Sequence, residues 1–172
     1  IASSFITIET FLEEFLIELS KKYDVFVATN LNNLNKNELS FKYEHNFRLI
    51  HIPIRRKINL YFDFLTLIFL FFIIKKNKFE LTLSLTPKAG LLTSLSSFLN
   101  FIKIRIHIFN GQIWYNKTGF KRVLLKYLDK ITFFLSNYCL CESKSQVDFL
   151  ISEGFQSKKI NVIADGSLMG VD

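Results

Sequence analysis

The turn at residues 86–90, Thr-Pro-Lys-Ala-Gly, holds the residue types best suited to bind an anionic ligand. It follows Leu81–Leu85, an apolar stretch that predicts a β-strand, and Pro87 ends this strand because proline has no N–H group to donate. A helix from Lys88 onward presents free backbone N–H groups at the carboxyl end of the strand, where ligands bind in open α/β sheets. Lys88 adds positive charge, and Gly90 keeps the first helical turn narrow. The alternative interpretation is an ordinary strand-to-helix loop with a solvated lysine.

Other catalytic or cofactor-binding patterns are absent from the sequence. It contains neither GxGxxG nor GxxxxGK[ST], which excludes the usual dinucleotide fingerprint and the P-loop. It has no HExxH motif and no zinc-ligand spacing, so we predict no metal site and no cofactor. His107 lies in a predicted strand, where a structural histidine is the favoured interpretation. Cys139 and Cys141 share one face of another predicted strand, and we interpret them as buried hydrophobic residues in a reducing, cytosolic compartment.

Hydrophobic periodicity predicts helices and strands that alternate along the chain. The predicted helices lie at residues 8–22, 60–76, 88–100, 120–136 and 144–154; Asn59 caps the second and Gly154 closes the last. The predicted strands lie at residues 24–29, 48–53, 80–85, 104–109, 138–141 and 159–163.

This order predicts a Rossmann-like, doubly wound α/β domain: a parallel sheet with helices on both faces and right-handed crossovers. At 172 residues the chain corresponds to one domain with a real hydrophobic core. A doubly wound sheet normally opens on a strand, whereas this chain opens on a predicted helix and stops at a turn. We therefore expect a domain at residues 1–172 that is truncated at both ends and lacks its first strand.

Basic residues gather in the middle of the chain. Residues 45–130 carry fifteen basic and three acidic residues, a net charge of +12, whereas both flanks are acidic. The predicted helix at residues 60–76 is apolar on nearly every face, and its apolar run Phe64–Ile74 is shorter than the roughly 20 residues that span a bilayer. We expect this helix either to be covered by neighbouring helices or to lie on an anionic membrane surface. Basic residues bracket it: Arg55, Arg56, Lys57, Lys75, Lys76 and Lys78.

Four segments together resemble a known family. TPKAG follows one predicted strand, RIHIFNGQIWYNKTGFKR contains the next, and ESKSQVDFLISEG and INVIADGSLMGVD follow in order. They resemble the amino-terminal half of retaining family 4 glycosyltransferases, which have the GT-B fold, and in particular the bacterial capsule and O-antigen enzymes. The resemblance covers residues 8–172, and GSLMGVD is its most specific part. It implies an acceptor-side domain whose donor-binding partner domain lies outside this chain.

The resemblance also implies an activity. The full-length protein would be a hexosyltransferase that moves a sugar, with retention, from a nucleotide-sugar to a saccharide acceptor in cell-surface polysaccharide synthesis. Such acceptors are commonly lipid-linked and presented at the inner leaflet of the cytoplasmic membrane, which implies a cytoplasmic protein peripheral to that membrane. The family's donor motif and glycine-rich loop do not occur in residues 1–172, so this chain alone is expected to be inactive.

The resemblance and the turn positions suggest which residues meet substrate. Asn110 stands where many family members have a histidine, and its amide can still hydrogen-bond a sugar hydroxyl. The residues expected to bind substrate are Thr86, Lys88, Gly90, Asn110, Gly111, Gln112, Ser143, Gly166 and Ser167, and those expected at the membrane surface are Arg55, Arg56, Lys57, Lys75 and Lys76.

A different class of function remains open on the sequence alone. The alternative is a non-catalytic Rossmann-like module that binds a nucleotide or another ligand, and the sequence beyond Asp172 would discriminate between the two. A nucleic-acid partner is supported by charge alone, and most phenylalanines lie in apolar runs rather than among basic residues. We therefore expect no nucleic-acid binding.

Overall fold

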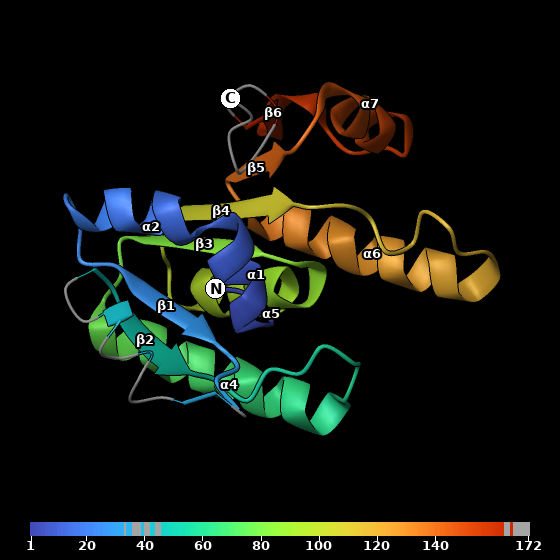
Figure 1. Ribbon diagram of the computed structural model, residues 1–172. Helices are drawn as coiled ribbons and strands as arrows, with labels where there is room; N and C mark the ends of the chain where they lie inside the picture. Colours follow the sequence, from blue (N-terminus) through green and yellow to red (C-terminus); the bar gives the residue numbers. More distant parts are fainter. Residues whose placement is uncertain (33, 36–38, 40–41, 44–45, 164–165, 167–172) are drawn as a thin grey trace.

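The computed structural model describes residues 1–172 except 33, 36–38, 40–41, 44–45, 164–165 and 167–172. Helices and strands alternate along most of the chain (Figure 1). The strands are β1 (Phe26–Thr29), β2 (Arg48–His51), β3 (Leu81–Leu85), β4 (Ile104–Phe109), β5 (Tyr138–Cys141) and β6 (Ile160–Val162). The helices are α1 (Phe5–Phe11), α2 (Glu13–Ser20), α4 (Leu60–Asn77), α5 (Pro87–Leu99), α6 (Gly119–Leu135) and α7 (Lys144–Ser152), with a short 3-10 helix at Ser157–Lys159.

All strand pairs in the described residues are parallel, as predicted, and they form two sheets, β1-β2 and β3-β4-β5-β6. Ile1 and Ala2 connect these sheets. The amino group of Ile1 donates to the carbonyl of Leu83 at 2.7 Å, and the carbonyl of Ile1 accepts from the N–H of Leu85 at 2.9 Å. On the other side, the N–H of Ala2 donates to the carbonyl of Ala28 at 3.2 Å. Two residues thus lie between β1 and β3, where one more strand would make a continuous sheet.

Helices cover both faces of these sheets, which confirms the predicted α/β class. α1 and α2 pack on one face, where Ile8 joins Leu85 of β3 in one buried cluster. α4 and α5 cover the opposite face, where Leu70 and Leu92 join Ala28 of β1 in a second cluster. α5 lies between α4 and α6 (Figure 1). The layers fix the carboxyl ends of all strands at one edge, where the loops that can hold a ligand begin.

The first helix departs from the prediction of a single helix at residues 8–22. The structure has two helices, α1 and α2, which begin at Phe5 and meet at Leu12, whose φ of −129° is not helical. Leu12 is buried. The break therefore places a leucine into the core at the junction, while α1 and α2 both contribute to the same cluster. No proline or glycine marks the junction, so the sequence carried no signal for it.

The longest helix, α4, has the ends that the sequence predicted. The side chain of Asn59 accepts a hydrogen bond from the N–H of Phe62 at 3.1 Å, which is an N-cap interaction. Lys75 and Lys76 lie in the last turn, where positive charge complements the helix dipole. The buried side of α4 carries Thr66, Leu70 and Ile74. Its exposed side carries a stripe at helical spacing, formed by Tyr61, Phe64, Ile68 and Phe72.

Candidate functional site

Thr86 begins the loop after β3 with a strained backbone. Its φ of +76° and ψ of 142° lie in a region that β-branched residues rarely adopt. Its hydroxyl donates to Oγ of Ser3 at 3.1 Å, which joins this loop to the segment before α1. Strain of this kind costs on the order of 1–3 kcal/mol and clusters at functional positions. The strain therefore supports the choice of this loop as part of the candidate site.

Lys88 does not extend into solvent. Its ammonium donates to Oδ1 of Asp63 at 2.8 Å and to the carbonyl of Lys57 at 2.6 Å, and both side chains of the ion pair are only about 15% exposed. The interaction ties the start of α5 to the start of α4. The alternative interpretation of a solvated lysine thus does not describe this structure, while a contact of Lys88 with substrate stays a prediction.

Gly90 lies against His107, which is buried on β4. A Cβ atom at Gly90 would stand 2.3 Å from Cε1 of the His107 ring. Oγ of Ser84 and Nδ1 of His107 are 2.9 Å apart, and burial lowers the pKa of His107 to about 3. His107 is therefore a neutral, structural histidine at physiological pH, as expected. Gly90 faces this ring from α5, and because glycine has no side chain, α5 can pack closely against His107 on the sheet.

The loop after β4 is anchored by Trp114, which is fully buried. Its Nε1–H donates to Oδ2 of Asp129 on α6 at 2.7 Å, and its ring stacks on Phe149 of α7 with centroids 5.3 Å apart. The cations of Arg122 and Lys126 lie 5.6 and 5.7 Å from the same ring. This anchor fixes the loop that carries the predicted residues Asn110, Gly111 and Gln112.

These three loop residues lie at the carboxyl edge of β4. Asn110 is half-buried, and Gly111 is exposed with a φ of +104° that favours glycine. Nε2 of Gln112 is buried without a hydrogen-bond partner within the described part of the chain. An unpaired buried donor is unfavourable and is commonly satisfied by a ligand or water. This amide is therefore a candidate contact for a bound molecule.

No local pattern marks Asp129 as special, since it is a single acidic residue on the basic helix α6. Burial raises the pKa of its carboxyl group to about 6, although the hydrogen bond from Trp114 acts in the opposite direction. A carboxyl whose pKa is raised on folding stabilises the fold below its unfolded pKa near 4, and this contribution is lost as the pH rises through about 6. The buried carboxyl of Asp129 therefore contributes less to the stability of the fold at neutral pH than in acid, even though Trp114 still donates to it.

We expect Asp129→Asn to stabilise the chain at pH 8. The carboxamide oxygen still accepts from Trp114, and the buried charge is gone. Thermal unfolding from pH 4 to pH 8 should show similar midpoints for wild type and variant near pH 4. At pH 8 the variant should unfold a few degrees higher, since roughly 1 kcal/mol shifts the Tm of such a chain by about 2–4 °C. A variant that is less stable at pH 8 would contradict this assignment.

The remaining predicted site residues follow β5 and β6. Oγ of Ser143 accepts from the N–H of Gln146 at 3.2 Å and so caps α7. Gly166 has a φ of +99°, and a Cβ there would stand 3.3 Å from the carbonyl oxygen of Glu142. Gly166 therefore combines a left-handed backbone conformation with a close approach to the loop after β5, and both favour glycine at this position. Ser167 and the rest of GSLMGVD lie outside the described residues.

A polar pocket that the sequence did not reveal lies at the same edge. It has a volume of about 250 Å³, and its lining comes from three segments far apart in sequence. The lining residues are Ser3, Ser4, Phe5, Ile6, Asn30, Asn32, Leu34 and Arg56. The hydrogen bond between Ser3 and Thr86 places this pocket next to the strained loop after β3.

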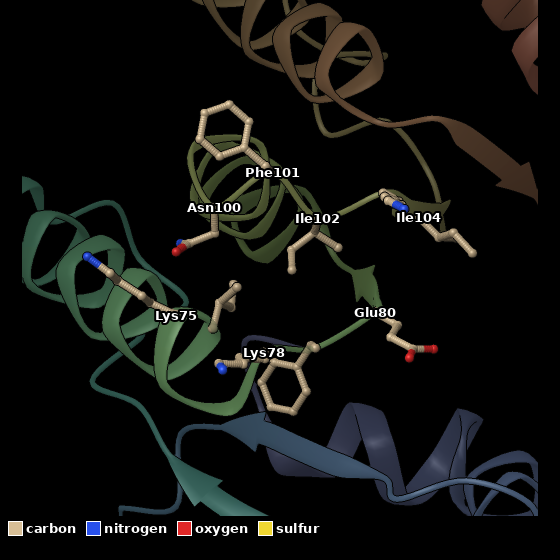
Figure 2. A pocket seen from close by; sticks show the side chains of 10 residues that line it. Lys75, Lys78, Glu80, Asn100, Phe101, Ile102 and Ile104 are labelled. Atoms are coloured by element: carbon tan, nitrogen blue, oxygen red, sulfur yellow. The ribbon is translucent and has the colours of Figure 1, made fainter.

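A larger hollow of about 530 Å³ lies at the opposite edge of the sheet (Figure 2). It is bounded by the ends of α4 and α5 and the starts of β3 and β4, with Lys75, Lys78, Glu80, Asn100 and Phe101 around it. None of the predicted substrate-binding residues lines it. The candidate site is therefore assigned to the carboxyl edge, although the larger hollow lies elsewhere.

Two features are absent from the described residues. No group of three histidine, cysteine, aspartate or glutamate side chains is placed to hold a metal ion there. No helix there is long and apolar enough to cross a membrane.

No family model matches the chain. The sequence is similar to the capsular polysaccharide biosynthesis glycosyltransferase CapM of Staphylococcus aureus, with 31% identity over 121 residues. These residues are 70% of this chain and 32% of that protein, so the chain spans about a third of the length of the curated relative that it matches. The resemblance to capsule glycosyltransferases is therefore supported at the level of a distant similarity.

Solved structures show the same fold. A putative UDP-N-acetylglucosamine 2-epimerase from Listeria monocytogenes matches with a TM-score of 0.66 at 12% identity, over 93% of this chain and 42% of that chain. The UDP-GlcNAc 2-epimerase from Methanocaldococcus jannaschii matches with a TM-score of 0.60 at 13% identity, over 94% and 43% of the two chains. At such identities the similarity concerns the fold alone. The chain has the fold of one half of these GT-B-like structures, which confirms the predicted fold class.

Proposed function

We propose that this chain is the acceptor-binding half of a retaining glycosyltransferase that acts in cell-surface polysaccharide synthesis. The similarity to CapM over 70% of the chain carries the proposal. The fold supports it, because the chain matches less than half of each similar structure and thus forms one lobe. In the proposed enzyme the other lobe binds the nucleotide-sugar, and transfer takes place between the lobes.

Ile1 and Ala2 lie between the two sheets of the proposed domain, bonded to β3 on one side and to β1 on the other. The donor-binding domain is proposed to lie outside residues 1–172.

The proposed acceptor site is the carboxyl edge of the sheets. It combines the loops after β3, β4, β5 and β6 with the polar pocket beside Ser3. Transfer requires that the acceptor hydroxyl be held in line with the donor sugar and that the leaving diphosphate be neutralised. The proposed substrate contacts are Thr86, Lys88, Gly90, Asn110, Gly111, Gln112, Ser143, Gly166 and Ser167.

The proposed acceptor is lipid-linked, so the protein is proposed to bind the cytoplasmic leaflet of the membrane. The exposed stripe of α4 supports this: Tyr61, Phe64 and Phe72 are each more than 60% exposed. Neighbouring helices therefore leave this side of α4 uncovered within the described residues. Arg55–Lys57 precede α4, and Lys75 and Lys76 lie in its last turn. These basic residues can interact with anionic head groups.

Calorimetric titration of this chain tests the assignment of the lobe. UDP-sugars and GDP-sugars should bind with a Kd weaker than about 1 mM, a free energy of less than about 4 kcal/mol, because most donor contacts belong to the other lobe. Micromolar binding of a nucleotide-sugar to residues 1–172 would mean that this lobe holds the donor instead.

A further inference from the structure

The pocket of about 250 Å³ at the carboxyl edge has a lining suited to a sugar. Ser3, Ser4 and Asn32 contribute hydroxyl and amide groups, which can donate to and accept from sugar hydroxyls. Ile6, which is exposed, contributes an apolar side chain against which the C–H groups of a sugar ring can pack, and the buried Phe5 lies behind it in the core. The volume is smaller than the roughly 300–1,000 Å³ of pockets for drug-sized ligands, so it corresponds to one sugar unit.

Asn30 holds two walls of this pocket together. Its Nδ2 donates to the carbonyl of Ile54 at 2.6 Å, which connects the loop after β1 to the segment after β2. Its Oδ1 accepts from the N–H of Asn32 at 2.8 Å, which fixes the turn within the first of these loops. These two hydrogen bonds of the half-buried Asn30 therefore connect the pocket walls, and the segment that carries Arg56 is one of them.

Arg56 brings the charge. Its side chain is exposed, and within the described part of the chain no hydrogen bond, ion pair or aromatic contact is found for its guanidinium group. The preceding residue differs: the guanidinium of Arg55 stacks over the ring of Phe62, 3.4 Å from its centroid. Two adjacent arginines thus have separate roles, since one supports α4 and the other lines the pocket without a partner. A guanidinium group without a protein partner can pair with phosphate or carboxylate in a bidentate manner.

We infer that this pocket binds an anionic sugar unit of the acceptor, with the sugar between Ser4 and Asn32 and its phosphate or carboxylate group paired with Arg56. The inference rests on the proposed function and makes it more specific. It assigns the acceptor to the class of acidic or phosphorylated saccharides. It also separates Arg56 from the basic residues expected to contact only the membrane surface.

Nuclear magnetic resonance titration of this chain tests the inference. The probes are glucose 1-phosphate, glucuronate, the neutral methyl glucoside and inorganic phosphate, and the signals followed are the side-chain amides of Asn30 and Asn32. We expect both acidic sugars to bind at least about tenfold more tightly than methyl glucoside, since a charge-assisted hydrogen bond of this kind is typically worth a ten- to hundredfold change in affinity. Arg56→Gln should abolish this difference, and Arg55→Gln should preserve it.

Other results of these titrations would contradict specific parts of the inference. Equal binding of the neutral sugar, or an equal loss in both arginine variants, removes Arg56 as the anion contact. Inorganic phosphate that binds as tightly as glucose 1-phosphate removes the sugar from the inference. Thermal unfolding of both variants controls for folding. If the full-length enzyme transfers sugar while the pocket binds none of the probes, only this inference fails; if the pocket binds them and no transfer occurs, the proposed function fails.

Discussion

Replacing Gly90 with alanine is expected to destabilise the chain by about 1–3 kcal/mol, although the change adds a single methyl group. The added Cβ would stand 2.3 Å from Cε1 and 2.7 Å from Nδ1 of His107. The ring has little room to move away, because Nδ1 is bonded to Ser84 and the ring contacts Phe109 edge-on at 4.5 Å between centroids. α5 would therefore have to shift away from the sheet and pull the loop at Thr86 with it.

A double-mutant cycle isolates the clash. His107→Val removes the ring and keeps a residue that suits a strand. In that background Gly90→Ala should cost little, so the two substitutions should show a coupling free energy of about 1–3 kcal/mol in chemical denaturation. If Gly90→Ala is as stable as wild type, the close packing of α5 on His107 is not present in solution.

Reversing the charge of four basic residues, two before α4 and two in its last turn, is expected to release the chain from anionic membranes. The wild-type chain should sediment with anionic liposomes at low salt and much less with neutral ones. A basic residue near an anionic surface contributes on the order of 1 kcal/mol, so a variant with glutamate at these four positions should lose binding by several orders of magnitude. The positions are Arg55, Arg56, Lys75 and Lys76.

A control with the same change in net charge separates local from overall electrostatics. Four exposed lysines serve for this purpose; they lie in the loop before α6, on α6, on α7 and in the short 3-10 helix, at Lys117, Lys121, Lys144 and Lys158. Their reversal should leave most of the liposome binding in place. Equal sedimentation with neutral vesicles, binding to neither kind, or an equal effect of both sets of reversals would contradict membrane contact through the exposed stripe of α4.

The elements that the sequence predicted well are those with local signals. β4 and β5 have the predicted bounds, because buried parallel strands appear as short apolar runs between turns. The start of α4 is set by Asn59, whose side chain caps it. Gly154, with a φ of +85°, closes α7 as a left-handed residue. In each case one or a few adjacent residues determine the structure.

The features that the sequence did not predict depend on residues distant in the chain. The polar pocket brings together Ser3, Asn30 and Arg56, and nothing in their spacing marks them as neighbours. Asp129 accepts a hydrogen bond from Trp114, fifteen positions away in the chain. This contact depends on the packing of α6 against the loop after β4, which no local pattern predicts. Lys88 lies at a strand-to-helix turn, as the sequence predicts. Its ion pair with Asp63 forms only because α5 packs on α4, which the sequence does not show.

Sugar transfer by the full-length protein is the decisive measurement for the proposed function. The protein should be incubated with radiolabelled nucleotide-sugars and a fraction of lipid-linked saccharide acceptors, and the label should be followed by chromatography. We expect label to move to the acceptor with the anomeric configuration of the donor, and a version without residues 1–172 to transfer none. A folded full-length protein that binds nucleotide-sugar but transfers no label would contradict the proposed function. Transfer of label by a version without residues 1–172 would contradict it as well.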